Sequence, residues 1–273
     1  MSQPTLETIL ATTRRRIALL RPRTAELEHQ AERAPAPRPF AAALGGRRGV
    51  GVIAEVKRRS PSAGAIAPGL DPVEHAAAYA RGGAVAISVL TDELHFGGSL
   101  EDLTRVAAQV ALPVLRKDFI LDELQLFEAR AAGASGVLLI VKALKPTHLK
   151  SLARTARDLG LGVLVEAHAD WELDAALAAE PTAVGVNSRD LATFTIDLGA
   201  AERLIARVPP GIPVVAESGI ETRGDISRMA AAGADLVLVG SSVARAADPE
   251  AAVRALCGVA RLGRATPRQP TSA

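Results

Sequence analysis

Charged and amide side chains stand near the ends of several strongly apolar segments, where buried strands usually exclude them. In VIAEVKRRSPSAG, residues 52–64, Glu55 and Lys57 follow an apolar start and lie two residues apart. Residues two apart on a strand point to the same face, so this pair shares a face with Ile53. The same spacing recurs at Lys117, Glu166, Asn187 and Glu217, which follow Leu115, Leu164, Gly185 and Val215 by two residues.

Three carboxylates and two lysines at one end of a sheet would change one another's pKa values. Enzymes use such arrangements to hold general acids and bases near neutral pH, so the set predicts a site for proton transfer. Any single member could instead form an ion pair that stabilises the rim of the sheet. Catalysis explains the whole set better.

A repeated unit must position these residues. Amphipathic helical patterns end in glycine and are followed by short apolar strands, most clearly at Gly133 and Gly233, where glycine fits a left-handed C-cap without steric cost. Strands are predicted at 50–57, 84–90, 113–119, 136–142, 162–167, 183–188, 213–218 and 235–240. Helical patterns between them, and one after the last, complete eight βα units.

The strands are apolar along most of their length, which is typical of parallel strands covered on both faces. Eight such units in about 220 residues predict an α/β fold, a single-domain (β/α)8 TIM barrel with an extra N-terminal helical segment. An open doubly wound sheet is the competing architecture. It is disfavoured because the glycine signature of a phosphate loop is missing after the first strand.

The chain divides by composition into three parts. Residues 1–49 contain a helical pattern and the Pro-rich connector APAPRPF, and they are expected to pack on the barrel. The barrel takes residues 50–263, and the polar, Pro-containing residues 264–273 are expected to be disordered. The apolar stripe of the first helix consists of Leu6, Ile9, Leu10, Ile17 and Leu20.

Two glycine- and serine-containing segments follow the last two strands. They read ESGI at 217–220 and VGSS at 239–242. Loops in these positions, together with a helix N-terminus, form phosphate sites in many such barrels because free backbone N–H groups and the helix dipole attract an anion. Ser218, Gly219, Gly240 and Ser241 are therefore candidate phosphate ligands, and SPSAG at 60–64 has a similar composition.

Composition excludes several other classes of protein. Lysine and arginine total 32 against 30 acidic residues, and the excess arginine lies near the termini, so a nucleic-acid partner is not expected. No apolar run approaches the roughly 20 residues that span a bilayer, and the polar N-terminus lacks a signal-peptide core. The single cysteine, Cys257, reads as a core thiol, and the five histidines lack metal-ligand spacing. We expect a cytoplasmic protein without a metal or cofactor.

Several longer segments together resemble one family, the indole-3-glycerol phosphate synthases of tryptophan biosynthesis. They are IAEVKRRSPSAG, ISVLTDELHFGGSLEDL, LPVLRKDFI, LVEAH, VGVNSRDL, VAESGI and LVGSS, in the family's order, and they cover residues from about 50 to 245. The resemblance implies a carbon–carbon lyase with a (β/α)8 barrel and no cofactor. It converts 1-(2-carboxyphenylamino)-1-deoxyribulose 5-phosphate to indole-3-glycerol phosphate, with loss of CO2 and water.

The resemblance also implies roles for individual residues. Lys117 is the general acid that protonates the carbonyl as the ring closes, and Glu166 is a base or stabilises the cation. Glu55 and Lys57 assist dehydration and hold the anthranilate carboxylate. The remaining implied ligands are Asn187 for a substrate hydroxyl, Ser60, Ser218, Gly219, Gly240 and Ser241 for the phosphate, and Arg189 and Glu217 as supporting residues.

Other functions remain open at this point. Phosphoribosylanthranilate isomerase would share the last two loops but would not explain Lys57, Lys117 and Glu166 together. A sugar-phosphate-binding barrel without catalysis is a second alternative, against which the intact catalytic candidates argue. We expect the partner to be a small sugar-phosphate substrate. We also expect the protein to be a monomer or a weak homo-oligomer.

Overall fold

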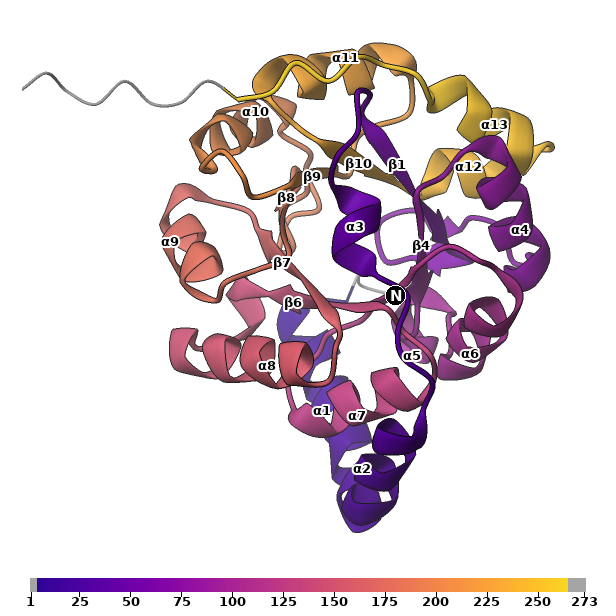
Figure 1. The fold of residues 1–273 in the computed structure, drawn as a ribbon, viewed down its shortest axis with the longest axis vertical. Coiled ribbons are helices and arrows are strands. Elements are labelled where there is room, and N and C mark those ends of the chain that lie inside the picture. Colours follow the sequence, from indigo (N-terminus) through magenta and orange to yellow (C-terminus); the bar gives the residue numbers. More distant parts are fainter. Residues whose placement is uncertain (1–3, 265–273) are drawn as a thin grey trace, which may run out of the picture.

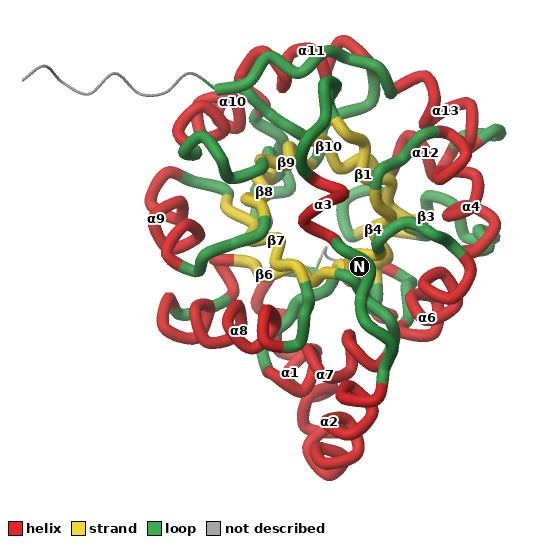
Figure 2. The backbone as a smooth tube through the Cα atoms, in the orientation of Figure 1, coloured by secondary structure: helices red, strands yellow, loops and turns green. Residues whose placement is uncertain are grey.

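The chain forms a closed ring of parallel strands surrounded by helices, seen in a computed structural model that describes residues 4–264 (Figures 1 and 2). The barrel strands are β1 (Gly51–Val56), β4 (Ala86–Leu90), β5 (Val114–Lys117), β6 (Gly136–Ile140), β7 (Gly162–Ala167), β8 (Ala183–Asn187), β9 (Val214–Glu217) and β10 (Leu236–Val239). β1 pairs with both β4 and β10, so the ring is closed. The predicted barrel is confirmed, with each strand inside its predicted range, and the open sheet is excluded.

Helices follow the strands in the expected alternation. They are α4 (Pro72–Gly82), α5 (Glu93–Phe96), α6 (Leu100–Gln109), α7 (Glu123–Ala131), α8 (Pro146–Asp158), α9 (Asp170–Ala178), α10 (Leu198–Arg207), α11 (Arg223–Ala232), α12 (Ser241–Arg245) and α13 (Pro249–Leu256). A 3-10 turn, η2 (Val141–Ala143), and a short hairpin of β2 (Arg59–Ser60) and β3 (Gly64–Ala65) complete the barrel. Gly133 and Gly233 both have positive φ, as their predicted positions at helix ends require.

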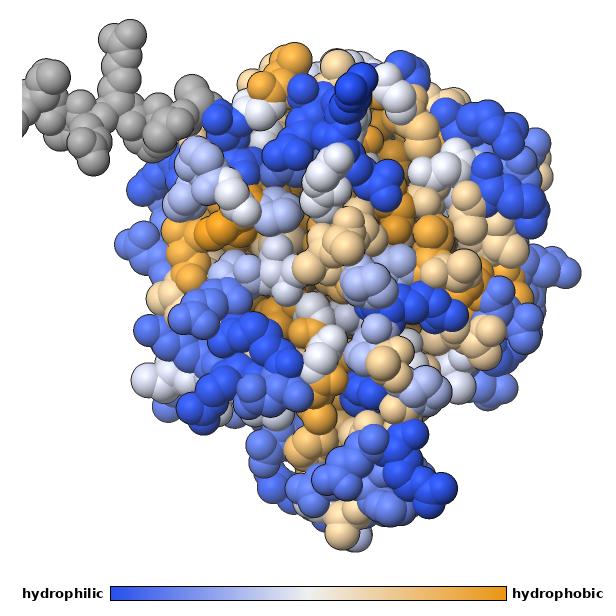
Figure 3. All heavy atoms as spheres, viewed as in Figure 1, coloured by the Kyte–Doolittle hydropathy of each residue, from blue (hydrophilic) through white to orange (hydrophobic). Residues whose placement is uncertain are grey.

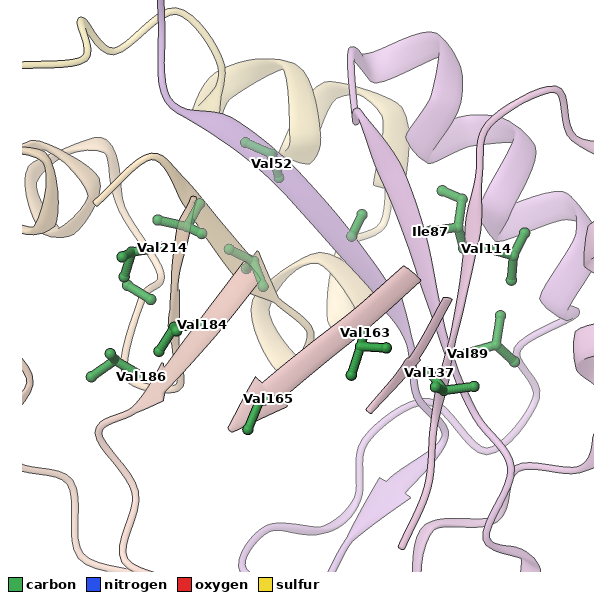
Figure 4. Close-up of a cluster of buried hydrophobic side chains, with 14 of the residues drawn as sticks. Val52, Ile87, Val89, Val114, Val137, Val163, Val165, Val184, Val186 and Val214 are labelled. Atoms are coloured by element: carbon green, nitrogen blue, oxygen red, sulfur yellow. The ribbon is translucent and has the colours of Figure 1, made fainter. Parts of the chain in front are cut away.

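Two hydrophobic clusters stabilise the barrel. One lies between the strands and the surrounding helices and contains the outward residues shown in Figure 4, such as Val52, Val163 and Val214. The other fills the interior with residues of opposite parity, such as Ile53, Leu115 and Leu164. Burial of both faces explains why the strand sequences are apolar throughout instead of alternating.

The N-terminal segment contains more than the single predicted helix. It consists of α1 (Leu6–Leu20), the 3-10 turn η1 (Arg21–Arg23), α2 (Thr24–Arg33) and α3 (Phe40–Leu44). Ile9 and Leu10 of the predicted stripe join the interior cluster, whereas Leu20 packs with Leu27 and Leu124. α2 lies along α7 and projects from the ring in Figure 1, and its outer end is largely hydrophilic in Figure 3.

The short helix α3 closes one end of the barrel. It lies across the opening in Figure 2, and its Phe40 ring packs on Gly136 and Gly162, the first residues of β6 and β7. A Cβ at Gly162 would lie 2.4 Å from a ring atom of Phe40, so glycine is required there for the ring to fit. The charged strand ends therefore lie at the opposite end of the barrel.

The described part of the chain extends one residue beyond the predicted barrel. Arg264, assigned above to the disordered tail, has a side chain that is 4% exposed and pairs with Asp235 at 2.8 Å. It also donates to the main-chain carbonyls of Val208 and Ile212. A buried carboxylate thus provides this residue with a partner, and the division of the chain stays a prediction. Residues 265–273 lie outside the described part of the chain.

We predict that Phe40→Ala lowers the free energy of unfolding by about 3–5 kcal/mol, the usual cost of removing a buried phenyl ring. Urea denaturation followed by circular dichroism measures the change. Leu19→Ala is the control, because Leu19 is 75% exposed on α1. If the two variants unfold at the same urea concentration, α3 does not act as a plug.

Candidate active site

The carboxyl ends of the strands surround one cavity, and all twelve candidate residues line it. They come from the ends of six of the eight strands or the loops after them: Glu55, Lys57 and Ser60 from β1 and the following hairpin, Lys117 from β5, Glu166 from β7, Asn187 and Arg189 from β8, Glu217, Ser218 and Gly219 from β9, and Gly240 and Ser241 from β10. Strand parity brings Glu55, Lys117, Glu166, Asn187 and Glu217 together, because each continues a row that fills the barrel interior. The other candidates reach the cavity from the loops and the hairpin that follow the strands.

Lys117 lies between two buried carboxylates at the floor of this cavity. Its Nζ is 3.2 Å from Oε2 of Glu166 and 3.4 Å from Oε2 of Glu217. The two carboxylates are 1% and 2% exposed, and the lysine side chain is 15% exposed. The lysine therefore forms the ion pair that the sequence left open, and it also faces the cavity.

Burial and charge act in opposite directions on these pKa values. Burial alone would lower the pKa of Lys117, but attraction by Glu166, Glu217 and Glu55 raises it above its ordinary value. Burial would raise the pKa of Glu166, but the charges of Lys117 and His168 lower it. Burial and the neighbouring Glu166 raise the pKa of Glu217 to about 8, despite the opposing charge of Lys117. At neutral pH the floor thus holds an ammonium, a carboxylate and a carboxylic acid.

Two glycines make room for these charges. A Cβ at Gly185, which is paired in register with Glu166, would lie 2.3 Å from Oε1 of Glu217. A Cβ at Gly240 would lie 2.4 Å from Oε1 of Glu55 and 2.9 Å from Nζ of Lys57. Gly240 thus has a function besides the one predicted for it, because the absence of a side chain there accommodates the Glu55–Lys57 ion pair.

The Glu55–Lys57 pair forms a second acid–base group beside the floor. Lys57 Nζ lies 2.7 Å from Oε1 of Glu55, whose side chain is 5% exposed. β1 ends at Val56, so Lys57 leaves the strand and turns back toward Glu55. The ion pair that the two residues form can transfer or stabilise a proton at the cavity wall.

The β8 side supplies an amide and a guanidinium. Asn187 Oδ1 accepts a 3.0 Å hydrogen bond from the main-chain N–H of Arg189, which directs its amide group. Arg189 donates to the carbonyl of Phe194 at 3.1 Å and makes no carboxylate ion pair within residues 4–264. Burial lowers the pKa of Arg189 below its ordinary value. A half-buried cation with no acidic partner favours an anionic group of a ligand.

The loops after β9 and β10 form the small-residue wall. Ser188 Oγ donates to the carbonyls of Glu217 and Ser218 and so fixes the first loop. Ser218 has φ of 65° and Gly219 has φ of 67°, a conformation that is strained for serine. Gly240 is the N-cap of α12, so the first N–H groups of that helix have no acceptor within the helix. This wall offers main-chain donors to an anion.

The sequence reasoning missed the apolar wall. Phe96 and Phe119 line the cavity with their ring centroids 6.2 Å apart, and Leu138, Ile140, Leu191 and Leu238 also line it. Phe119 follows Lys117 by two residues, and the same parity rule that selected Lys117 could have selected it. Phe96 lies at the end of α5, and no strand pattern indicates its position.

A buried ion network ties α1 to the back of the floor. Asp118, the residue after Lys117, is 2.6 Å from Arg16 of α1 and 3.0 Å from Arg116. Burial would raise the pKa of Asp118, but Arg116 and Arg16 lower it below its usual range. The N-terminal segment therefore contacts the strand end that carries Lys117. The polar, arginine-rich face of α1 would be expected to lie in solvent, but Asp118 gives Arg16 a buried partner.

The described residues provide no sign of a metal centre or a membrane segment. Within residues 4–264, no three His, Cys, Asp or Glu side chains are grouped so that they could hold a metal ion. None of the helices in that range combines the length and apolar composition that crossing a membrane requires.

Comparison with known proteins identifies the family. The sequence model of the family described as indole-3-glycerol phosphate synthase matches residues 6–256. The chain belongs to this family. It is 49% identical over 228 residues to the indole-3-glycerol phosphate synthase of Mycolicibacterium vanbaalenii, covering 84% of each chain, and 48% identical over 223 residues to that of Dehalococcoides mccartyi, covering 81% of this chain and 86% of the relative.

Membership of this family establishes the function. The chain is a carboxy-lyase of tryptophan biosynthesis that forms indole-3-glycerol phosphate from a phosphorylated sugar. The isomerase and the non-catalytic barrel are therefore set aside.

Solved structures support the fold alone. A thiamine phosphate pyrophosphorylase from Pyrococcus furiosus has a TM-score of 0.58 at 20% identity, and the match covers 77% of this chain and 94% of that protein. An N-acetylmannosamine-6-phosphate 2-epimerase from Clostridium perfringens has a TM-score of 0.58 at 15% identity, and the match covers 75% of this chain and 90% of that protein.

The raised pKa of Glu217 predicts a pH-dependent stability. Glu217 keeps its proton in the folded state up to a pH of about 8, whereas the unfolded side chain loses it near its ordinary value of 4.5. The folded state therefore binds more protons between these values, and the free energy of unfolding from this group falls as pH rises through that window. Glu217→Gln stays neutral and should flatten this part of the stability profile, measured by urea unfolding from pH 5 to pH 9. An equally steep profile in both proteins would contradict the assignment.

Proposed function

We propose that the twelve cavity residues, with the aromatic wall, divide the reaction into anion binding, ring binding and proton transfer. The substrate is 1-(2-carboxyphenylamino)-1-deoxyribulose 5-phosphate. The observation that carries the proposal is the position of Lys117, whose ammonium is held by Glu166 and Glu217 at the floor of a cavity that has an apolar and a glycine–serine wall. The reacting carbonyl lies between the aryl and phosphate ends of such a substrate, as Lys117 lies between the two walls.

The two ends of the substrate match the two walls. Phe96 and Phe119 receive the aryl ring by apolar contact. The phosphate binds the N–H groups and hydroxyls of Ser60, Ser218, Gly219, Gly240 and Ser241. Lys57 holds the anthranilate carboxylate, and Arg189 supports binding of the anionic substrate. Asn187 accepts a hydrogen bond from a sugar hydroxyl or donates one to it.

Lys117 acts as the general acid of ring closure. The aryl carbon that bears the carboxylate bonds to the carbonyl carbon, and the carbonyl π electrons move to oxygen, which takes a proton from the lysine. The raised pKa keeps the ammonium protonated beforehand, and the developing alkoxide is a stronger base than Glu166 or Glu217. Glu166 stabilises the cationic ring. The bond to the carboxylate then breaks, CO2 leaves, and its electron pair restores the aromatic ring.

Dehydration completes the indole. The new hydroxyl takes a second proton, from the Lys57 ammonium, and leaves as water, while a proton is lost from the carbon next to nitrogen. The Glu55–Lys57 pair assists this step, because it provides one acidic and one basic partner within 2.7 Å of each other. Glu166 is the base for the proton that is lost.

We also propose that the protein is cytoplasmic and is a monomer or a weak homo-oligomer. The proposed oligomeric state is supported by the exposed large apolar side chains among the described residues, which lie on separate elements, such as Leu19 on α1, Leu94 on α5 and Trp171 on α9. Single exposed apolar residues are normal for a protein surface and do not form an interface. Sedimentation velocity across a hundredfold range of concentration tests the oligomeric state.

Lys117→Met keeps the length of the side chain but removes the ammonium, so it should lower kcat about 10²- to 10⁴-fold, the usual contribution of a general acid. Substrate affinity, measured by titrating the inactive variant, should change much less because the walls remain. Indole fluorescence of the product reports turnover.

The matched control for this variant is Lys150→Met, since Lys150 is exposed on α8. It should turn over like the parent. If Lys117→Met retains activity within a few-fold of the parent, Lys117 is an ion-pair residue of the barrel and another group is the acid.

Ser241→Asp places a carboxylate at the start of α12, where it should repel the phosphate without disturbing the fold, since acidic residues suit a helix N-terminus. We expect a KM raised more than tenfold and loss of competition by inorganic phosphate in steady-state assays. Ser227→Asp on the exposed face of α11 is the control. Unchanged phosphate competition in Ser241→Asp would place the phosphate elsewhere.

A further inference from the structure

One buried histidine beside the floor takes no part in the chemistry proposed above. The side chain of His168, directly after β7, is 5% exposed, and its Nε2 lies 3.3 Å from Oε1 of Glu166. This nitrogen has no hydrogen-bond partner in the described part of the chain. Nε2 is therefore directed at the catalytic carboxylate with no other group to satisfy it.

The other ring nitrogen faces a second buried carboxylate. Nδ1 of His168 lies 3.4 Å from Oε2 of Glu172, and the same oxygen accepts a 2.7 Å hydrogen bond from the main-chain N–H of His168. Glu172 is fully buried in the first turn of α9. A carboxylate at Nδ1 selects the form of the ring in which that nitrogen carries a proton.

This placement restricts where protons can reside. With Nδ1 protonated, a neutral ring presents a lone pair at Nε2, which would face the lone pairs of an ionised Glu166. The contact becomes favourable when one proton lies between the two groups. The carboxylates on both sides favour placing that proton on Nε2, and Lys117 already favours the ionised form of Glu166 from its other oxygen.

The surrounding charged groups do not offer the imidazole another partner. On β5 and β9, Lys117 and Glu217 face Glu166. On η2 and α9, the charged neighbours are paired elsewhere: Lys142 with Asp190 at 3.1 Å, and Asp170 with Arg207 at 2.8 Å. The chain of contacts therefore runs from Glu172 through His168 to Glu166.

We propose that His168, oriented by Glu172, is a positioning residue that shares one proton with Glu166 and keeps this carboxylate ionised between two cationic donors, ready to accept a proton from the substrate. The proposal rests on the role given above to Glu166. Neither His168 nor Glu172 lines the cavity, so both act through Glu166 and not by touching the substrate.

The test is the pH profile of kcat in His168→Gln. The positive imidazole lowers the pKa of Glu166, so its removal raises that pKa, and Glu166 stays protonated and inactive to a higher pH. The acidic limb of the profile should move upward by roughly one pH unit or more, because an opposite charge within about 4–6 Å shifts a carboxyl pKa by about 1–3 units. KM should change less than twofold.

Glu172→Gln should move the acidic limb in the same direction by a smaller amount. It keeps the imidazole but removes the carboxylate that stabilises the positive charge of the ring. His29→Gln is the control, because His29 is exposed on α2, and its profile should superimpose on the parent's. A folded His168→Gln protein whose profile superimposes on the parent's would overturn the proposal, leaving His168 as a residue that only holds the turn before α9.

A measurement on the unaltered protein decides the proton placement even if the variants fail to fold. Nitrogen NMR of the 15N-histidine-labelled chain should show one of the five imidazoles with protons on both Nδ1 and Nε2 throughout the pH range in which the enzyme is active. Absence of that form would overturn the proposal independently of turnover. If instead the parent shows this form but produces no indole-3-glycerol phosphate, the catalytic roles proposed for the cavity fail while the contact between His168 and Glu166 stands.

Discussion

The buried ammonium of Lys117 is the constraint on which the rest of the site depends. A charge at this depth is unstable without partners, and removing one partner of a buried pair typically costs about 3–5 kcal/mol. Two carboxylates flank it, but two ionised carboxylates would overcompensate a single cation. Glu217 resolves this by holding a proton, as its pKa of about 8 indicates. The charge of the floor is thus balanced by the proton on Glu217.

The barrel can tolerate these charges because its stability comes from elsewhere. The interior and outer clusters bury apolar side chains on both faces of every strand, and α3 seals the opposite end. Closure of the ring satisfies the backbone donors and acceptors of its strands, so none of the eight barrel strands is an edge strand. The polar strand ends therefore add chemistry to one end of a structure that the apolar clusters hold together.

Of the twelve candidate residues that line the cavity, those in loops came from glycine–serine composition and family resemblance. The fold and the charged strand ends were predicted for a simple geometrical reason. Side chains on a strand alternate with a period of two, and the carboxyl ends of parallel strands meet at one end, so Lys117 and Glu166 had to converge. The proposed roles of these residues go beyond this geometry. Parity could have found Phe119, whereas the other features that sequence reasoning missed depend on strand register or lie beyond the strands. The space above Gly185 and Gly240 follows from strand register, and His168 lies just beyond the strand to which the parity rule was applied.

Closure of the ring also places a demand on the order in which the protein can fold. β1 is among the first elements made, yet its register partners on β10 lie almost two hundred residues later, Gly51 opposite Leu236 and Ala54 opposite Val239. Glu55 then needs the gap above Gly240. During synthesis, the first strand must therefore remain with one side unpaired until the last strand emerges. Such non-local pairing slows folding and leaves apolar edges exposed to aggregation, so the active site is assembled in the same event that removes that hazard.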